Sequence, residues 1–187
     1  MEFVDNILKE LCEYRPPLTK RADFDKFWRG TIEESRAVPL ESQVIEYDYP
    51  SPFAKVYDIT YNGFDRPRIH GWYMYRQFVN RRNMPCIVSY HGYGGNRGRP
   101  AAFMQWLMAG FAVISIDCRD QNGDTGSRAV YSSGSTQSAV CKGILDKNEY
   151  YFRSVYMDCM RAIDFAYTRD EIDKGRIIVE GSSQGGA

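Results

Sequence analysis

Residues 176–186 read Arg-Ile-Ile-Val-Glu-Gly-Ser-Ser-Gln-Gly-Gly, a β-branched run followed at once by a Gly-x-Ser-x-Gly turn. This order predicts a buried strand over Arg176–Glu180 that turns sharply into a helix, with Ser183 at the tip. By composition alone the turn pattern arises in roughly one chain in twenty of this size. Its place at the exit of a strand favours a nucleophilic serine over a plain glycine-rich turn, and Gly181 and Gly185 permit the tight bend.

A nucleophilic serine also needs backbone amides that stabilise the oxyanion of an acyl-transfer intermediate. Gln184 follows Ser183 and offers one amide, and the loop His91–Gly95 follows the predicted strand Cys86–Ser89 and offers another. The same loop fails as a Gly-x-Gly-x-x-Gly nucleotide site because Arg97 stands in the place of the third glycine. The chain has no P-loop either, so we do not expect nucleotide binding.

The chain has two histidines, His70 and His91. A catalytic base of this kind follows the serine in the chain, whereas His91 precedes Ser183, so we expect His91 to shape the oxyanion loop through hydrogen bonds. We expect His70, inside a strand, to be structural. Aromatic residues near these positions could stack on sugars, but their spacing favours a place in the core. They are Trp72, Tyr73, Tyr75, Tyr90 and Tyr93.

Upstream patterns predict an α/β fold. An amphipathic helix is expected over Met1–Tyr14, and a second begins near Asp23 and stops before Pro39. Three alternating segments predict an antiparallel meander, namely Gln43–Tyr49, Lys55–Tyr61 and Arg68–Tyr75. Buried strands then alternate with helices, which predicts parallel pairing. These are the strands Cys86–Ser89, Phe111–Ile116 and Arg176–Glu180, and the helices Pro100–Ala109 and Glu149–Thr168.

The length of 187 residues suits a single α/β domain over 1–187, with N-terminal helices in 1–40 and a sheet with flanking helices in 41–187. The Gly-, Ser- and Thr-rich stretch from Asp117 to Glu149 is too long for a routine connection, and predicts a functional or interface loop. Arg81-Arg82 predicts a solvated turn.

Composition excludes several partners. Because 24 basic side chains balance 24 acidic ones, we expect neither nucleic acid nor anionic lipid as a partner. The longest apolar segment, Phe111–Ile116, is far below the roughly 20 residues that span a bilayer. Five scattered cysteines without a Cys-x-x-Cys pair suit reduced thiols in a cytoplasmic protein. Neither histidine adjoins a cysteine or acidic cluster, so no metal is expected.

Four separated motifs resemble the acetyl xylan esterase/cephalosporin C deacetylase family of carbohydrate esterases. They are Ala22–Trp28, His91–Tyr93, Lys142–Asp146 and Gly181–Gly186. The resemblance implies an α/β-hydrolase fold, mostly parallel, and deacetylation of short xylo-oligosaccharides and cephalosporin-type esters. It also implies a cytoplasmic homo-oligomer, often a hexamer, without a cofactor.

Carried over by position, the resemblance makes Ser183 the nucleophile and the amides of Tyr93 and Gln184 the oxyanion hole, with Tyr93 also touching substrate. One departure is visible, because the family's Arg-Gly-Gln appears here as Arg119-Asp120-Gln121. If that glycine has a positive φ, Asp120 is strained.

In the family, the catalytic acid and histidine follow strands that come after the serine turn. The sequence ends at Ala187, before any such strand. We therefore expect a hydrolase domain truncated after the serine turn, lacking C-terminal strands and helices and inactive alone. The strand Arg176–Glu180 would then be an edge, with Ile177, Ile178 and Val179 uncovered. The alternative is a non-catalytic fragment that associates through this exposed sheet edge.

Overall fold

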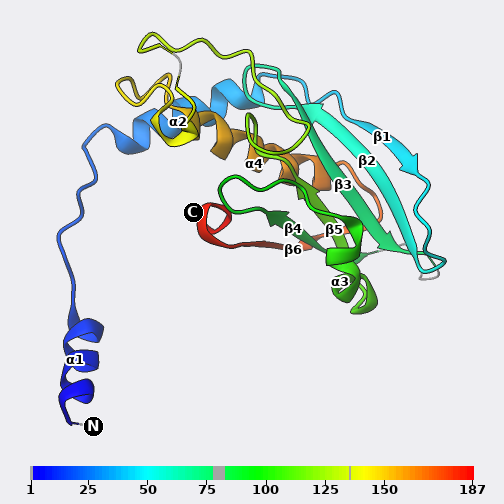
Figure 1. Ribbon diagram of the computed structural model, residues 1–187, viewed down its shortest axis with the longest axis horizontal. Coiled ribbons are helices and arrows are strands. Elements are labelled where there is room, and N and C mark those ends of the chain that lie inside the picture. Colours follow the sequence, from blue (N-terminus) through cyan, green and yellow to red (C-terminus); the bar gives the residue numbers. More distant parts are fainter. Residues whose placement is uncertain (1, 78–82, 135) are drawn as a thin grey trace. The chain divides into compact units, whose positions relative to one another are not determined.

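The computed structural model describes residues 2–77, 83–134 and 136–187 (Figure 1). The chain forms two compact units, Met1–Gly30 and Thr31–Ala187. The single domain expected over 1–187 stays a prediction, and the turn expected at Arg81-Arg82 lies outside the described residues. Among the described helices, none has both the length and the apolar composition to cross a membrane.

Two helices begin the chain, as the sequence predicts. α1 spans Glu2–Glu13 and α2 spans Phe24–Arg36. At the start of α2 the ring of Trp28 packs edge-on against those of Phe24 and Phe27, with centroids 6.2 and 5.4 Å away. The aromatic spacing that predicts α2 therefore corresponds to ring packing along the helix.

A six-stranded sheet forms the core of Thr31–Ala187 within the described residues. Its strands are β1 Gln43–Tyr47, β2 Ala54–Asn62, β3 Arg68–Arg76, β4 Met84–Tyr90, β5 Ala112–Ile116 and β6 Ile172–Gly181. Their order is β1-β2-β3-β5-β4-β6, as Figure 1 shows. The predicted meander and the parallel pairing of β4 with β5 and β6 are confirmed. The mostly parallel sheet is wrong for these residues, because β3 pairs antiparallel with β5 and so joins the meander to the same sheet.

Helices cover both faces of the sheet. Successive strand residues point to opposite sides, so apolar side chains lie on both faces and each face packs against a helix. On one face α4, Tyr151–Tyr167, packs Ala162 and Phe165 against Val88 and Ile114. On the other face the predicted helix 100–109 divides into a 3₁₀ turn, η1 Pro100–Phe103, and a short α3, Met104–Met108. Leu107 of α3 there packs with Ile87 and Val113.

A buried ion pair connects α4 to the loops at the carboxyl end of β5. Arg119 and Asp158 are each 1% exposed. The guanidinium donates to both carboxylate oxygens of Asp158, with Nε 2.6 Å from Oδ2 and Nη2 2.7 Å from Oδ1. The turn between β2 and β3 joins them, since the Phe64 amide donates to Asp158 at 2.8 Å and the Phe64 carbonyl accepts from Arg119 at 2.6 Å. Three distant parts of the chain are thereby fixed together.

The predicted serine turn packs backbone against backbone. It follows β6 as a 3₁₀ turn, η3 Ser183–Gly186. A Cβ on Gly181 would overlap the carbonyl of Gly185, and a Cβ on Gly185 would overlap the carbonyl oxygen of Tyr90 at the end of β4. Only glycine fits such approaches, so these two residues place the serine beside β4.

β6 lies at an edge of the sheet, with β4 as its neighbour among the described strands. Ile178 and Val179 are 47% and 53% exposed, as the sequence predicts. The expectation was wrong for Ile177, which is half-buried and packs against the α4-side core because its side chain points toward that layer.

Replacing Gly185 by alanine is expected to lower the free energy of unfolding by about 1–3 kcal/mol or more, because the new methyl group must displace the backbone of Tyr90. The midpoint of urea unfolding measures this. Gly126→Ala is the control, since its Cβ meets nothing within 4 Å. Equal midpoints for the two variants would contradict the close approach.

Removing the buried carboxylate in Asp158→Ala is expected to cost about 3–5 kcal/mol, because Arg119 is left charged and unpaired in the core. The control on the same helix is Asp164→Ala, because the Asp164 side chain is 44% exposed and its partner Arg161 keeps hydrogen bonds to the carbonyls of Asn62 and Val38. That loss should be clearly smaller than the loss for Asp158→Ala. Thermal and urea unfolding giving the same loss for both would refute the assignment.

Candidate active site

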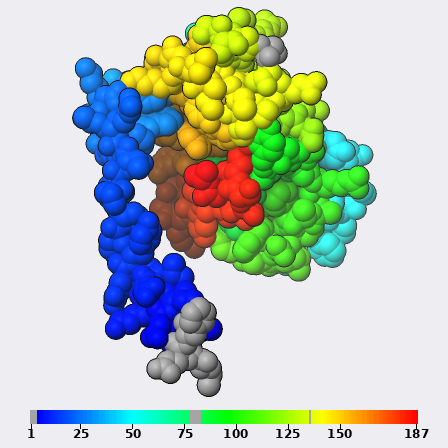
Figure 2. Space-filling model, turned by 60° about the vertical axis from the view of Figure 1, so that its left-hand side comes forward, coloured from blue at the N-terminus to red at the C-terminus, as the bar shows by residue number. Residues whose placement is uncertain are grey.

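Ser183 occupies a strained position at the surface. Its φ of 55° lies in the left-handed region, which is uncommon for residues other than glycine. Such a conformation costs roughly 1–2 kcal/mol, and strained residues held by their surroundings cluster at functional sites. Figure 2 shows the last residues of the chain (red) lying open at the surface, beside α4 and the green segment that includes the loop after β4.

The loop after β4 lies directly against Ser183. A Cβ on Gly92 would lie 3.5 Å from the carbonyl oxygen of Ser182 and 3.9 Å from Cβ of Ser183. Within the described part of the chain, no protein acceptor meets the amide N–H of Tyr93 or that of Gln184. The amide of Gln184 belongs to the first turn of η3, where N–H groups have no partner inside the helix. The two predicted donor segments are therefore brought together beside the serine.

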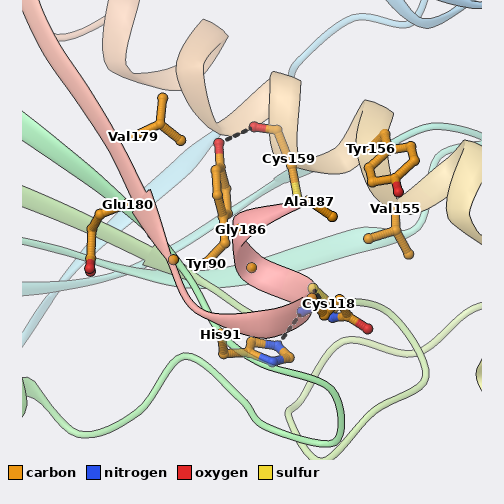
Figure 3. Close-up of a pocket in the computed structure, with 13 residues that line it drawn as sticks. Tyr90, His91, Cys118, Val155, Tyr156, Cys159, Val179, Glu180, Gly186 and Ala187 are labelled. Atoms are coloured by element: carbon orange, nitrogen blue, oxygen red, sulfur yellow. Dashed lines mark hydrogen bonds between the residues drawn. The ribbon is translucent and has the colours of Figure 1, made fainter. Parts of the chain in front are cut away.

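His91 is engaged by two backbone groups, as Figure 3 shows for the amide of Cys118. That amide can only donate, so Nε2 of His91 accepts its hydrogen bond at 2.9 Å. Nδ1 then carries the proton and donates to the carbonyl of Gly92 at 2.7 Å. The prediction that His91 shapes this loop through hydrogen bonds is confirmed.

His70 lies away from the serine. It is in β3, which β5 and β4 separate from β6. Three strand spacings correspond to about 14 Å. His70 instead lines a separate cavity of about 830 Å³ near the β2–β3 turn and residues 126–131.

The core position predicted for five aromatic residues holds for four of them. Trp72, Tyr73, Tyr75 and Tyr90 are buried, so their place in the core is confirmed. Tyr93 is 51% exposed, so a core position is wrong for it. Its hydroxyl accepts the amide N–H of Ala139 at 3.1 Å, which holds the ring against the long loop after β5.

The long loop after β5 reaches the site through Gln121, which follows the strained residue Asp120. Asp120 has a φ of 54°, so the strain expected at this position is confirmed. Its carboxylate pairs with Lys142 at 3.0 Å, on the distant part of the same loop. Gln121 contacts both Gly94 and Gln184, a role that the sequence did not predict. The only signal was the Arg-x-Gln motif itself.

A cavity of about 440 Å³ lies behind the serine turn (Figure 3). Its walls come from the ends of β4 and β6, from α4 and from the turn. Ser183 and Tyr93 are not among the lining residues, so the cavity lies on the α4 side of the turn. Tyr90 crosses it, and its hydroxyl donates to the carbonyl of Cys159 at 2.7 Å.

Two thiols, those of Cys118 and Cys159, line this cavity. Interaction with Cys159 lowers the pKa of Cys118, and the same interaction together with burial raises the pKa of Cys159. Nε2 of Gln184 donates to the sulfur of Cys118 at 3.4 Å. Across the described residues, no three His, Cys, Asp or Glu side chains gather as a metal site would need.

Comparison with known proteins identifies the family of this chain. The family model of acetyl xylan esterase matches residues 1–187. The acetyl esterase Axe7A of Xylanibacter ruminicola is 25% identical over 182 residues, covering 94% of this chain and 41% of that protein.

Two solved structures are similar over nearly all of this chain. The acetyl xylan esterase from Paenibacillus sp. R4 has 44% identity and a TM-score of 0.91, over 96% of this chain and 57% of that one. Acetyl xylan esterase 1 from Thermoanaerobacterium sp. JW/SL YS485 has 27% identity and a TM-score of 0.88, over 96% and 56%. This chain thus spans little more than half the length of these enzymes. Since the family model matches it from the first residue to the last, the chain belongs to the acetyl xylan esterase family.

Proposed function

We propose that the protein is a serine carboxylesterase that removes acetyl groups through an acyl-enzyme, with Ser183 as the nucleophile. The observation that carries this proposal is the strained Ser183 packed against Gly92, with two amides that lack protein acceptors beside it. Membership of an esterase family supports the same reaction class.

In the proposed reaction the hydroxyl oxygen of Ser183 attacks the acetyl carbonyl and forms a tetrahedral intermediate. The amides of Tyr93 and Gln184 donate to its oxyanion. The bond between the acetyl carbon and the sugar oxygen then breaks, the sugar hydroxyl leaves with the proton that Ser183 has lost, and water hydrolyses the acetyl-serine to acetate and free serine. Each amide donor of this kind is worth about 10² to 10³ in kcat.

The attack requires a general base, which the two histidines of the chain do not supply. Nε2 of His91 already accepts an N–H, and His70 is three strands away. We therefore propose that residues 1–187 by themselves are nearly inactive compared with an enzyme that has a complete triad, since removing one triad member leaves only about 10³ to 10⁴-fold catalysis over water.

The proposed substrates are acetylated xylo-oligosaccharides and cephalosporin-type acetate esters. The names of the similar enzymes support the first class, and the motif resemblance supports the second. On the same resemblance we propose a cytoplasmic homo-oligomer, a hexamer, that needs neither cofactor nor metal. Acyl transfer to a serine needs no redox group, which is consistent with this.

Ser183→Ala in the full-length protein is expected to lower kcat for an acetylated xylo-oligosaccharide by about 10⁴-fold or more. Acetate release measures this. The neighbouring Ser182→Ala is the control, because Ser182 has an extended backbone with φ of −125° and is expected to keep most of the activity. Unchanged acetate release by the Ser183 variant would end the assignment.

A second candidate is a non-catalytic role in which the chain associates through β6. The exposed edge with Ile178 and Val179 favours it, because unpaired strand edges recruit further strands.

For the second candidate, isolated residues 1–187 should associate in size-exclusion chromatography with light scattering. Val179→Lys should reduce the associated fraction, because a charge on the edge opposes pairing. Val130→Lys is the control, since Val130 is 90% exposed on the long loop. A stable, dispersed wild-type monomer would exclude this role.

A further inference from the structure

Gln121 joins the two amide-donor segments of the site through one side chain. Its Oε1 accepts the amide N–H of Gly94 at 2.7 Å. Its Nε2 donates to Oε1 of Gln184 at 3.0 Å and to the hydroxyl of Tyr151 at 2.9 Å. Both ends of the Gln121 amide are therefore bound, one to the backbone of the loop after β4 and the other to the side chain of Gln184 in the serine turn, which Cys118 also holds.

Tyr151 makes this connection rigid. It is the first residue of α4 and is fully buried. Its hydroxyl donates to the carbonyl of Arg119 at 2.5 Å, so toward Gln121 it acts as an acceptor. Arg119 is itself held by Asp158. Gln121 thereby attaches the site to the buried ion pair.

The peptide planes around Tyr93 show what Gln121 contributes. The Tyr93 N–H and the Gly92 carbonyl belong to one peptide group. That carbonyl accepts hydrogen bonds from His91 and, at 3.0 Å, from the amide N–H of Gly95. The next plane carries the Gly94 N–H and is held by Gln121. Because the peptide groups on both sides of Tyr93 are held by hydrogen bonds, the direction in which the Tyr93 N–H points is fixed.

We propose that Gln121 is a positioning residue that fixes the distance between the Tyr93 and Gln184 amides, and with it the oxyanion hole. The inference rests on the proposed function. An amide side chain suits this role because it accepts from one segment while it donates to the other. A shift of about 1 Å between such donors can cost about 10²-fold in rate.

Gln121→Glu tests the donor half of the amide in the full-length protein. The carboxylate still accepts from Gly94 but cannot donate to Gln184 or Tyr151. At pH 8 kcat is expected to fall by about 10-fold or more, with KM changed less than about 3-fold. The ratio of variant to wild-type kcat should rise toward pH 5, because a protonated carboxyl regains one donor, and an ordinary glutamate pKa is about 4.3.

Gln121→Ala tests the acceptor half independently of activity. The Gly94 amide loses its partner, so its hydrogen exchange should become at least about 10-fold faster than in wild type and in Gln121→Glu. Gln137→Glu is the control, since Gln137 is exposed on the same loop and should match wild type in every measurement.

The outcomes separate the two proposals. Wild-type kcat retained in both Gln121 variants, or a loss confined to KM and to thermal stability, would overturn the positioning role. A wild-type protein that releases no acetate would overturn the proposed function instead. In that case the exchange of the Gly94 amide still decides whether Gln121 holds the loop.

Discussion

The geometry around Ser183 depends on the buried ion pair between Arg119 and Asp158. Two charges leave water without a net loss only where hydrogen bonds replace their hydration, and here Phe64 satisfies each partner with a backbone group. Because the three residues come from the loop after β5, from α4 and from the β2–β3 turn, the pair sets the positions of all three. The carbonyl of Arg119 then orients Tyr151, and Tyr151 orients the loop that faces the serine.

A second constraint is steric. Where β6 ends, the backbone must turn within van der Waals contact of β4, and Gly181 and Gly185 leave no room for a side chain there. The strain of Ser183 is thus imposed by its neighbours and is not a local preference. Hydrogen bonds hold the loop after β4, while contact between backbones holds the serine turn, and the site lies where the two meet.

The sequence predicts the parts of this arrangement that depend on local pattern. Apolar periodicity located the six strands and the long α4, and the Gly-x-Ser-x-Gly turn located Ser183. Periodicity assigns residues to faces but not strands to neighbours, so the pairing of β3 with β5 was missed. The contacts of Gln121 were also missed, because they join residues 27 and 63 positions apart, and no local pattern encodes such distances.

Asp120 illustrates how one backbone conformation can have two chemical origins. A glycine reaches a φ of 54° through conformational freedom, whereas the aspartate is held there while its carboxylate contacts Lys142 across the loop. The ion pair lies within one loop and joins its two ends, so it holds the chain direction that brings Gln121 to the site. At this position an electrostatic contact thus offsets a backbone conformation that a Cβ disfavours.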